Sequence, residues 1–237
     1  MLVHLKAVPE TSKDYIVNTD TEPLIKKPEL ILACSSDRGL CGAIHSSVSK
    51  FARRLAAADR QNTKIVVLGD KAKPQICRDA RQNIIMHFTQ VGKEIPIFLD
   101  AAAICQTIQS QLQLKLNQET TNVGIIYNRF LSVLNYETVL VQLPASQDLI
   151  GAERMNAYEI SDTNIVKNLT EYLLACRLYW ALVEGHAAEM SAKRTAMENA
   201  TKNAEAMVNT LTMKYNRTRQ SVITNELVDI ITGASAL

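Results

Sequence analysis

One short segment combines residue types that could do chemistry. SSDRGLCGAIHSS, residues 35–47, holds two glycines, a thiol at Cys41 and an imidazole at His45, and it directly follows the apolar run ELILAC. The i, i+4 spacing would put Cys41 and His45 on one helix face, and a thiol near a helix N-terminus has a lowered pKa. A nucleophilic pair is therefore one hypothesis, although the sequence marks no third orienting group and no oxyanion pocket.

The same segment could instead bind a nucleotide. A dinucleotide turn needs GxGxxG, and only Gly39-Leu-Cys-Gly42 is present; a phosphate-binding Walker loop needs GK followed by Ser or Thr, which occurs nowhere in the chain. Asp37 would also place a carboxylate near the phosphate. An α/β nucleotide-binding regulator or enzyme stays open as an alternative function. The structural alternative is a turn whose Gly39 and Gly42 let a strand and a helix pack closely.

The metal-ligating residue types show no useful spacing. His4, His87 and His186 are isolated, and the five cysteines are scattered without a CxxC pair. This pattern favours reduced thiols over a disulfide frame or a zinc site. We expect no metal and no cofactor from these residues.

Composition excludes some function classes. The formal net charge is +2 and 47% of the residues are hydrophobic, which is typical of a globular protein without strong overall attraction to nucleic acid. The richest apolar stretch, YLLACRLYWALV, contains Arg177 and is shorter than the roughly 18 to 20 residues that span a bilayer. No targeting signal can be recognised at the start of the chain.

Alternating elements are predicted for the first part of the chain. Short β-branched or aromatic runs (29–35, 64–70, 83–91, 122–130 and 136–143) are separated by helix-compatible segments at 42–58, 71–81 and 98–116. The pattern indicates an α/β, Rossmann-like, mostly parallel sheet over 29–145, with the last two strands as a hairpin at its edge. We expect 1–28 to be irregular.

The remainder of the chain predicts one very long C-terminal coiled-coil helix. All six prolines lie at or before Pro144, and proline-free sequence permits uninterrupted helix. We assign residues 160–237 to this helical domain, with a predicted N-cap at Ser161 and a helix over about 163–232. Such a helix would be about 105 Å long and would project from the α/β domain. Alternating spacings of four and three residues mark an apolar stripe, the 4–3 stripe: Leu169, Leu173, Cys176, Trp180, Val183, Ala187, Met190, Arg194, Met197, Thr201, Ala204, Val208, Leu211, Tyr215, Thr218 and Val222.

The 4–3 stripe needs a partner helix, because each large apolar side chain removed from water contributes about 1.5 to 3 kcal/mol. Residues 1–28 hold three prolines and no helical period, so we expect the chain to lack half of its coiled coil. Lys193 to Arg219 carries six Lys/Arg and two Asp/Glu. This excess of positive charge indicates either a solvated helix face or a surface that binds the acidic loops of a protein or nucleic acid. Of the two binding functions, protein docking is favoured. The apolar end, NELVDIITGASAL, suggests insertion into a hydrophobic sleeve.

Three motifs together resemble a known family. They are SSDRGLCGAIHSSVSK, AAEMSAKRTAMENATKNA and YNRTRQSVITNELVDIITGASAL. With the preceding strand they are similar to the gamma subunit of F-type ATP synthase, mitochondrial form, over roughly residues 29–237.

The resemblance implies a central-stalk rotor without catalytic residues. Its long helix would run inside a ring of three alpha and three beta subunits, while its α/β domain would lie near the c-ring and the small stalk subunits, delta and epsilon. Rotation would couple proton flow to ATP synthesis. The implied location is peripheral, on the matrix side of the mitochondrial inner membrane, with no nucleic-acid partner.

The resemblance also implies contact residues. Arg219 and Gln220 match an arginine–glutamine pair that contacts a beta-subunit loop, and Thr224 and Glu226 occupy matching positions nearby. The apolar shaft tip adds Leu227, Ile230 and Ile231. Family members begin with a long helix antiparallel to the C-terminal one, and we expect this chain to lack it.

Overall fold

The computed structural model describes residues 16–18, 28–59, 61–112, 122–143, 158 and 163–235. Its elements, in chain order, are β1 (Ile16–Asn18), β2 (Leu30–Cys34), α1 (Ile44–Ala58), β3 (Lys64–Leu68), α2 (Lys73–Ala80), the 3-10 turn η2 (Arg81–Asn83), β4 (Ile84–Phe88), α3 (Phe98–Leu112), β5 (Val123–Phe130), β6 (Tyr136–Leu143) and α5 (Thr163–Ser235). The five predicted strands and the three predicted short helices are confirmed over these bounds. His4 and the predicted N-cap at Ser161 lie outside the described residues.

The strands form one sheet in the order β1-β6-β5-β2-β3-β4 within the described residues. β2 to β5 are parallel, and β6 runs antiparallel to β5 with Val123 opposite Leu143. The predicted hairpin is confirmed, but its predicted place at the sheet edge is wrong, because β1 pairs with the outer side of β6. β1 also corrects the expectation that 1–28 is irregular throughout.

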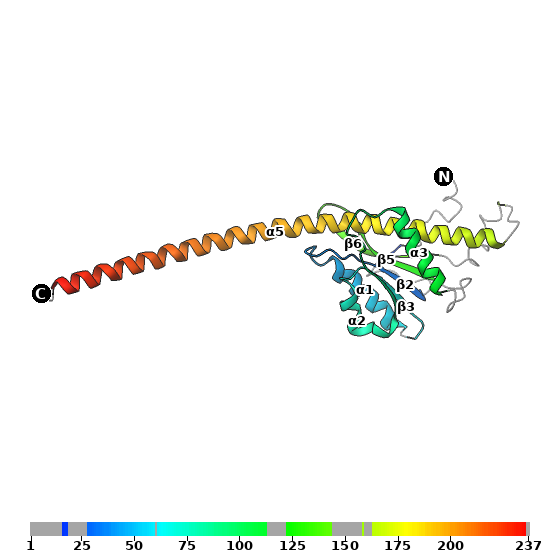
Figure 1. The fold of residues 1–237 in the computed structure, drawn as a ribbon, viewed down its shortest axis with the longest axis horizontal. Helices are drawn as coiled ribbons and strands as arrows, with labels where there is room; N and C mark the ends of the chain where they lie inside the picture. Colours follow the sequence, from blue (N-terminus) through cyan, green and yellow to red (C-terminus); the bar gives the residue numbers. More distant parts are fainter. Residues whose placement is uncertain are drawn as a thin grey trace. The chain divides into compact units, whose positions relative to one another are not determined.

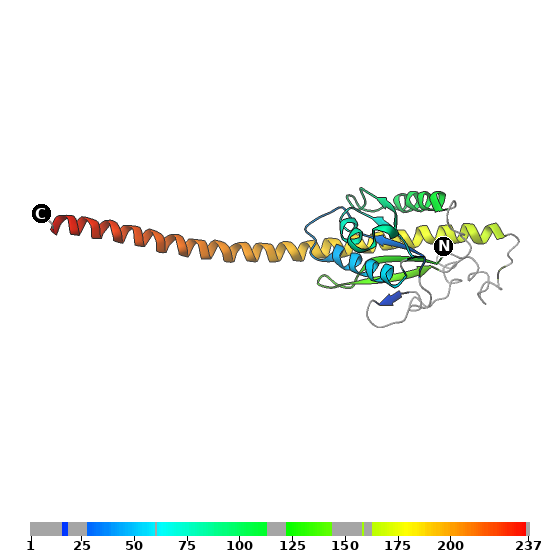
Figure 2. The same cartoon turned by 90° about the horizontal axis from the view of Figure 1, so that it is seen from below.

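Helices cover both faces of the sheet (Figure 1). Alternate residues of β2 point to opposite faces, as the period of a strand requires: Ile31 and Ala33 pack with α1 and α2, whereas Leu30 and Leu32 pack with α3 and α5. Figure 2 views the molecule from below, the side on which α1 and α2 lie in Figure 1. Both faces are buried along all of β2 and along β3 from Ile65 on, and the strands are continuously apolar over these residues.

The first part of α5 belongs to the core of the α/β unit. Leu174, Leu178 and Leu182 recur every four residues and pack against the sheet, and Leu178 is fully buried. The 4–3 stripe shares only part of this core: Leu173 is 7% exposed and belongs to it, whereas Trp180 is 59% exposed and Val183 is 40% exposed. The helix is therefore apolar on two faces, of which the sheet covers only one.

By packing, the chain divides after Lys193 rather than near residue 160. The second unit is Arg194–Leu237, and its described part, through Ser235, is helical and is exposed at every residue from Met197 on. Met207, Leu211, Tyr215 and Ile230 are each more than half exposed. The predicted uninterrupted helix is confirmed and continues to Ser235.

No helix in the described part of the chain combines the length and the apolar character that crossing a membrane requires.

Candidate functional site

The turn after β2 ties together three loops at the carboxyl end of the sheet. The Asp37 carboxylate accepts hydrogen bonds from the backbone N–H groups of Asp70 and Gln90, both at 2.6 Å. The Asp37 N–H donates to the Val91 carbonyl at 3.1 Å. Asp37 thus joins the loops that follow β2, β3 and β4. Its carboxylate is engaged by backbone amides.

Two glycines pack against Ser36, and neither is one that the sequence had suggested. A Cβ on Gly69 would lie 2.7 Å from the Ser36 backbone, and one on Gly92 would lie 2.8 Å from the Ser36 Cβ. Around Gly39 the nearest atom would be 3.9 Å away, and Gly42 has nothing within 4 Å. The prediction that Gly39 and Gly42 allow close packing is wrong. Gly42 is needed for its φ of +64°, which L side chains rarely adopt.

Cys41 and His45 do not form a nucleophilic pair. The Cys41 thiol donates to the Gly39 carbonyl at 3.1 Å and to Glu189 Oε1 at 3.7 Å. The His45 ring bonds instead to Ser35 Oγ and the Arg38 carbonyl, both at 2.9 Å. Burial, reinforced by the Glu189 charge, raises the pKa of the Cys41 thiol to about 11, so the thiolate is scarce at neutral pH. Burial lowers the pKa of His45.

A buried amide holds the start of α1 on the sheet. Asn128 of β5 donates to the Ile44 carbonyl at 2.9 Å and accepts from Thr138 Oγ1 at 2.7 Å and Ser47 Oγ at 3.1 Å. Because these polar groups are satisfied by one another, their burial is tolerated. Residues 35–47, which first suggested a catalytic or nucleotide-binding site, thus form a strand-to-helix turn held by hydrogen bonds.

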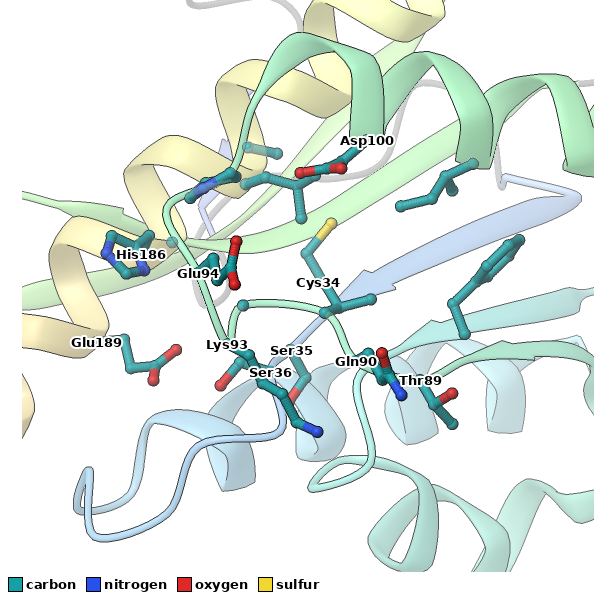
Figure 3. Close-up of a pocket in the computed structure, with 18 of the residues that line it drawn as sticks. Cys34, Ser35, Ser36, Thr89, Gln90, Lys93, Glu94, Asp100, His186 and Glu189 are labelled. Atoms are coloured by element: carbon teal, nitrogen blue, oxygen red, sulfur yellow. The ribbon is translucent and has the colours of Figure 1, made fainter.

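A cavity of about 490 Å³ lies beside this turn. Figure 3 shows its walls, which come from the ends of β2 and β4, the loop before α3, and α5. Its polar lining includes Ser35, Gln90, Lys93, Glu94, Asp100, His186 and Glu189. The carboxyl end of parallel strands is where open α/β sheets usually bind ligands.

Glu189 is the cavity residue that sequence reasoning missed. Its side chain is only 4% exposed, and neighbouring Ala188 packs with Cys41 and Ile44 at the start of α1. A carboxylate buried there disfavours the phosphate that a nucleotide-binding domain would place at this helix N-terminus. A signal was available, because Glu189 continues the i, i+4, i+7, i+11 spacing of Leu178, Leu182 and Gly185 along the buried face.

The predicted contact residues all lie on the exposed second unit, on two neighbouring faces of α5. Gln220, Thr224, Leu227 and Ile231 are spaced i, i+4, i+7 and i+11, and therefore share one face. Arg219, Glu226 and Ile230 share the adjacent face, spaced i, i+7 and i+11. Leu227 is 54% exposed, and Ile230 and Ile231 are 67% and 65% exposed. The side chains are thus available for contact, with the Thr224 hydroxyl already donating to the Gln220 carbonyl at 2.8 Å.

All five cysteines are free, His87 lies 3.0 Å from an Asp70 carboxylate oxygen, and His186 lines the cavity. Among the described residues there is no group of three or more His, Cys, Asp or Glu side chains placed to hold a metal ion.

Comparison with known proteins identifies the family. A family model described as ATP synthase matches residues 2–237. The chain is 41% identical over 236 residues to the mitochondrial ATP synthase subunit gamma of Yarrowia lipolytica, covering 98% of this chain and 78% of that protein. It is also 41% identical over 219 residues to the mitochondrial ATP synthase F(1) complex subunit gamma of Rattus norvegicus, covering 91% and 78%.

A solved structure agrees in fold. A chain of the Euglena gracilis mitochondrial ATP synthase, in a structure of OSCP, F1 and c-ring, superimposes with a TM-score of 0.78 at 17% identity, covering 99% of this chain and 83% of that one. The family match begins at residue 2, so it reaches the first 28 residues, which the sequence analysis had placed outside the resemblance. On these matches, the chain belongs to the gamma-subunit family of the ATP synthases.

Proposed function

We propose that this chain is the central-stalk rotor subunit of an F1Fo ATP synthase, coupling proton-driven rotation to ATP synthesis by the alpha/beta ring. As a gamma subunit it is a non-catalytic component of the complex. The observation that carries the proposal is the family match over residues 2–237, together with a helix whose residues 197–235 are exposed.

The second unit of α5 has the surface of a helix that other chains enclose. Apolar side chains such as Leu211, Val222 and Ile230 are at least half exposed. Enclosing each of them contributes about 1.5 to 3 kcal/mol relative to exposure in water. Along Lys193 to Arg219 the excess of four positive charges (six Lys/Arg against two Asp/Glu) would meet acidic loops.

Contact with the beta subunits is assigned to the two faces described above. Arg219 can donate to a carboxylate, and Gln220 can both donate and accept. Such hydrogen bonds form and break without covalent change, as contacts made by a rotating helix must. Leu227, Ile230 and Ile231 would lie in the apolar sleeve around the helix end, while Thr224 and Glu226 supply polar contacts between them.

The remaining partners follow from the family. Alpha and beta subunits would surround the second unit, and the α/β unit would contact the small central-stalk subunits, delta or epsilon, and the c-ring. The location is the matrix side of the mitochondrial inner membrane, as a peripheral subunit. No nucleic-acid partner is proposed.

The test is co-purification with the alpha and beta subunits of the same organism. Wild-type chain should be retained, and Arg219→Glu should lower the retained fraction, because it would repel an acidic loop. Lys50→Glu makes the same charge change at an exposed residue of α1, outside the second unit, and should be retained like wild type. A wild-type chain that does not co-purify would overturn the proposal; equal retention of both variants would overturn only the assignment of Arg219.

A further inference from the structure

The end of α5 carries a second apolar stripe, distinct from the 4–3 stripe. The 4–3 stripe stops at Val222, because its next two positions are Asn225 and Asp229. The second stripe, the tip seam, lies in the part of the second unit where every described residue is exposed. Its members alternate at spacings of three and four residues, as in a coiled coil: Met213, Asn216, Gln220, Ile223, Leu227 and Ile230.

The tip seam has the composition of a reversible helix pair. Its four apolar side chains are between 45% and 67% exposed. Pairing with another helix removes such a stripe from water. Asn216 and Gln220 interrupt the apolar residues, and polar residues at seam positions fix the register of a pair at a cost in stability. The seam therefore favours a specific pairing that can be undone.

The charges at this end of the helix are separated into two blocks. The basic block, residues 208–219, has three Lys/Arg and no acidic residue, and the acidic block, residues 224–235, has two Asp/Glu and no basic residue. The charged residues are Lys214, Arg217, Arg219, Glu226 and Asp229. Within the described part of the chain none of the five forms an ion pair. Two parallel copies would place each block against its like, whereas two antiparallel copies place basic against acidic.

One antiparallel register also places the tip seams of two copies against each other. In this register residues 208–235 of the two copies overlap end to end. Each seam residue then lies opposite a seam residue of the second copy: Met213 opposite Ile230, Asn216 opposite Leu227, and Gln220 opposite Ile223. Each pairing occurs twice, because a two-fold axis relates the copies. The same register thus matches the seam and the charge blocks.

Arg219 and Glu226 meet across the flank of the seam in this register. Each directly precedes a seam residue, and a two-fold axis brings the same flank of both helices together. Arg219 lies opposite Thr224 of the second copy, which is about 3 Å along the axis from Glu226 at a rise of 1.5 Å per residue. A charge-assisted hydrogen bond between Arg219 and Glu226 can therefore form at two symmetry-related places.

We propose that the unassembled chain pairs with a second copy of itself through the tip seam, antiparallel, with Arg219 of each copy against Glu226 of the other. A second copy supplies the matching seam and both charge blocks at once. The pairing occupies Arg219, Gln220 and Leu227, which the proposed function assigns to contact with the beta subunits. Self-pairing and assembly would therefore exclude one another. The pairing is measured on the chain alone, so its failure would leave the rotor proposal standing.

Sedimentation equilibrium of the full chain, from ~1 to ~100 μM, tests the pairing over the range of a reversible complex. We expect a monomer–dimer equilibrium, with the dimer at twice the chain mass of 26.3 kDa. Arg219→Glu puts two carboxylates together at both symmetry-related places and should weaken dimerisation at least ~10-fold. Combining Arg219→Glu with Glu226→Arg exchanges the charges, restores both pairs and should return dimerisation to the wild-type level. Lys202→Glu makes the same single charge change outside the overlap of 208–235 and should dimerise like wild type.

The exchanged pair separates the antiparallel dimer from other associations. In a parallel dimer Arg219 would face its own copy, so the double substitution would not reverse the effect of the single one. A chain that stays monomeric up to ~100 μM, or that forms only larger aggregates, would overturn the proposal. Wild-type dimerisation by Arg219→Glu, no recovery in the double variant, or equal weakening by Lys202→Glu would also overturn it. Circular dichroism verifies the fold of each variant, and all three substituted positions are exposed.

Discussion

Two leucines of the same helix should respond very differently to truncation. Leu178 is fully buried in the core between the sheet and α5, whereas Leu211 is 57% exposed in the second unit. Leu178→Ala loses buried apolar surface and leaves a cavity, which costs about 2 to 5 kcal/mol. Leu211→Ala should change the free energy of unfolding by less than about 0.5 kcal/mol. Both substitutions have the same intrinsic helix propensity, so their difference reports packing alone.

Urea denaturation of the isolated chain measures this difference. The chain has a single tryptophan, Trp180, which lies on α5 two residues from both Leu178 and Leu182 and supplies a fluorescence signal. A loss of about 3 kcal/mol with an m-value of about 2 to 3 kcal/mol/M lowers the midpoint by roughly 1 to 1.5 M. Equal midpoints for Leu178→Ala and wild type, or an equally large loss in Leu211→Ala, would show that the sheet does not hold the first part of α5.

Three further outcomes are expected. Gly69→Ala should cost more than about 2 kcal/mol, because its φ is +90° and a Cβ would meet the Ser36 backbone at 2.7 Å; Gly39→Ala, with open space around it, should stay within about 0.5 kcal/mol in the same denaturation assay, and equal costs would refute the packing around Ser36. The pKa of Cys41 is raised from 9.0 to about 11, so its contribution to stability should be full below pH 9 and lost between pH 9 and 11. Alkylation of this thiol in the native state should therefore be slow at pH 8, and rapid native-state labelling, located by mass spectrometry, would contradict this. Burial lowers the pKa of His45 from 6.5, so the folded state binds that proton less tightly and loses stability as pH falls below 6.5; His45→Gln should reduce this slope, and an unchanged slope would count against the buried neutral ring.

Much of the fold could be predicted because its signals are local. β2, β3 and β5 are runs of β-branched and apolar residues buried on both faces, and the chain between them follows helical spacing. β1 could not be predicted in the same way, since a three-residue strand is defined by its pairing with β6, more than a hundred residues later in the chain. The edge position of the hairpin was wrong for the same reason.

The long helix shows how one sequence pattern can conceal another. The 4–3 stripe was visible because it continues beyond the α/β unit. The sheet packs on Leu173 of that stripe, but mostly on Leu174, Leu178 and Leu182, which lie outside it. Trp180 was counted as part of the stripe and is 59% exposed. The periodicity of the sequence predicted the helix correctly. It could not predict which face of the helix packs against the sheet, because that depends on the tertiary structure.

The turn after β2 shows the limit of motif reasoning. The sequence suggested that Cys41 and His45 form a pair. In the structure the Cys41 thiol bonds to the Gly39 carbonyl and the His45 ring bonds to the Arg38 carbonyl. The two closely packed glycines, Gly69 and Gly92, come from other loops and are distant in sequence from Ser36. Glu189 was likewise missed, because its significance depends on the start of α1, which lies far away along the chain.

Native mass spectrometry of the chain co-expressed with alpha and beta subunits tests the rotor assignment most directly. We expect one copy of this chain in each complex with the alpha/beta ring, as its central position requires. Alpha and beta subunits that assemble without this chain, with the chain detected only as free monomer, would contradict its assignment as the central-stalk rotor.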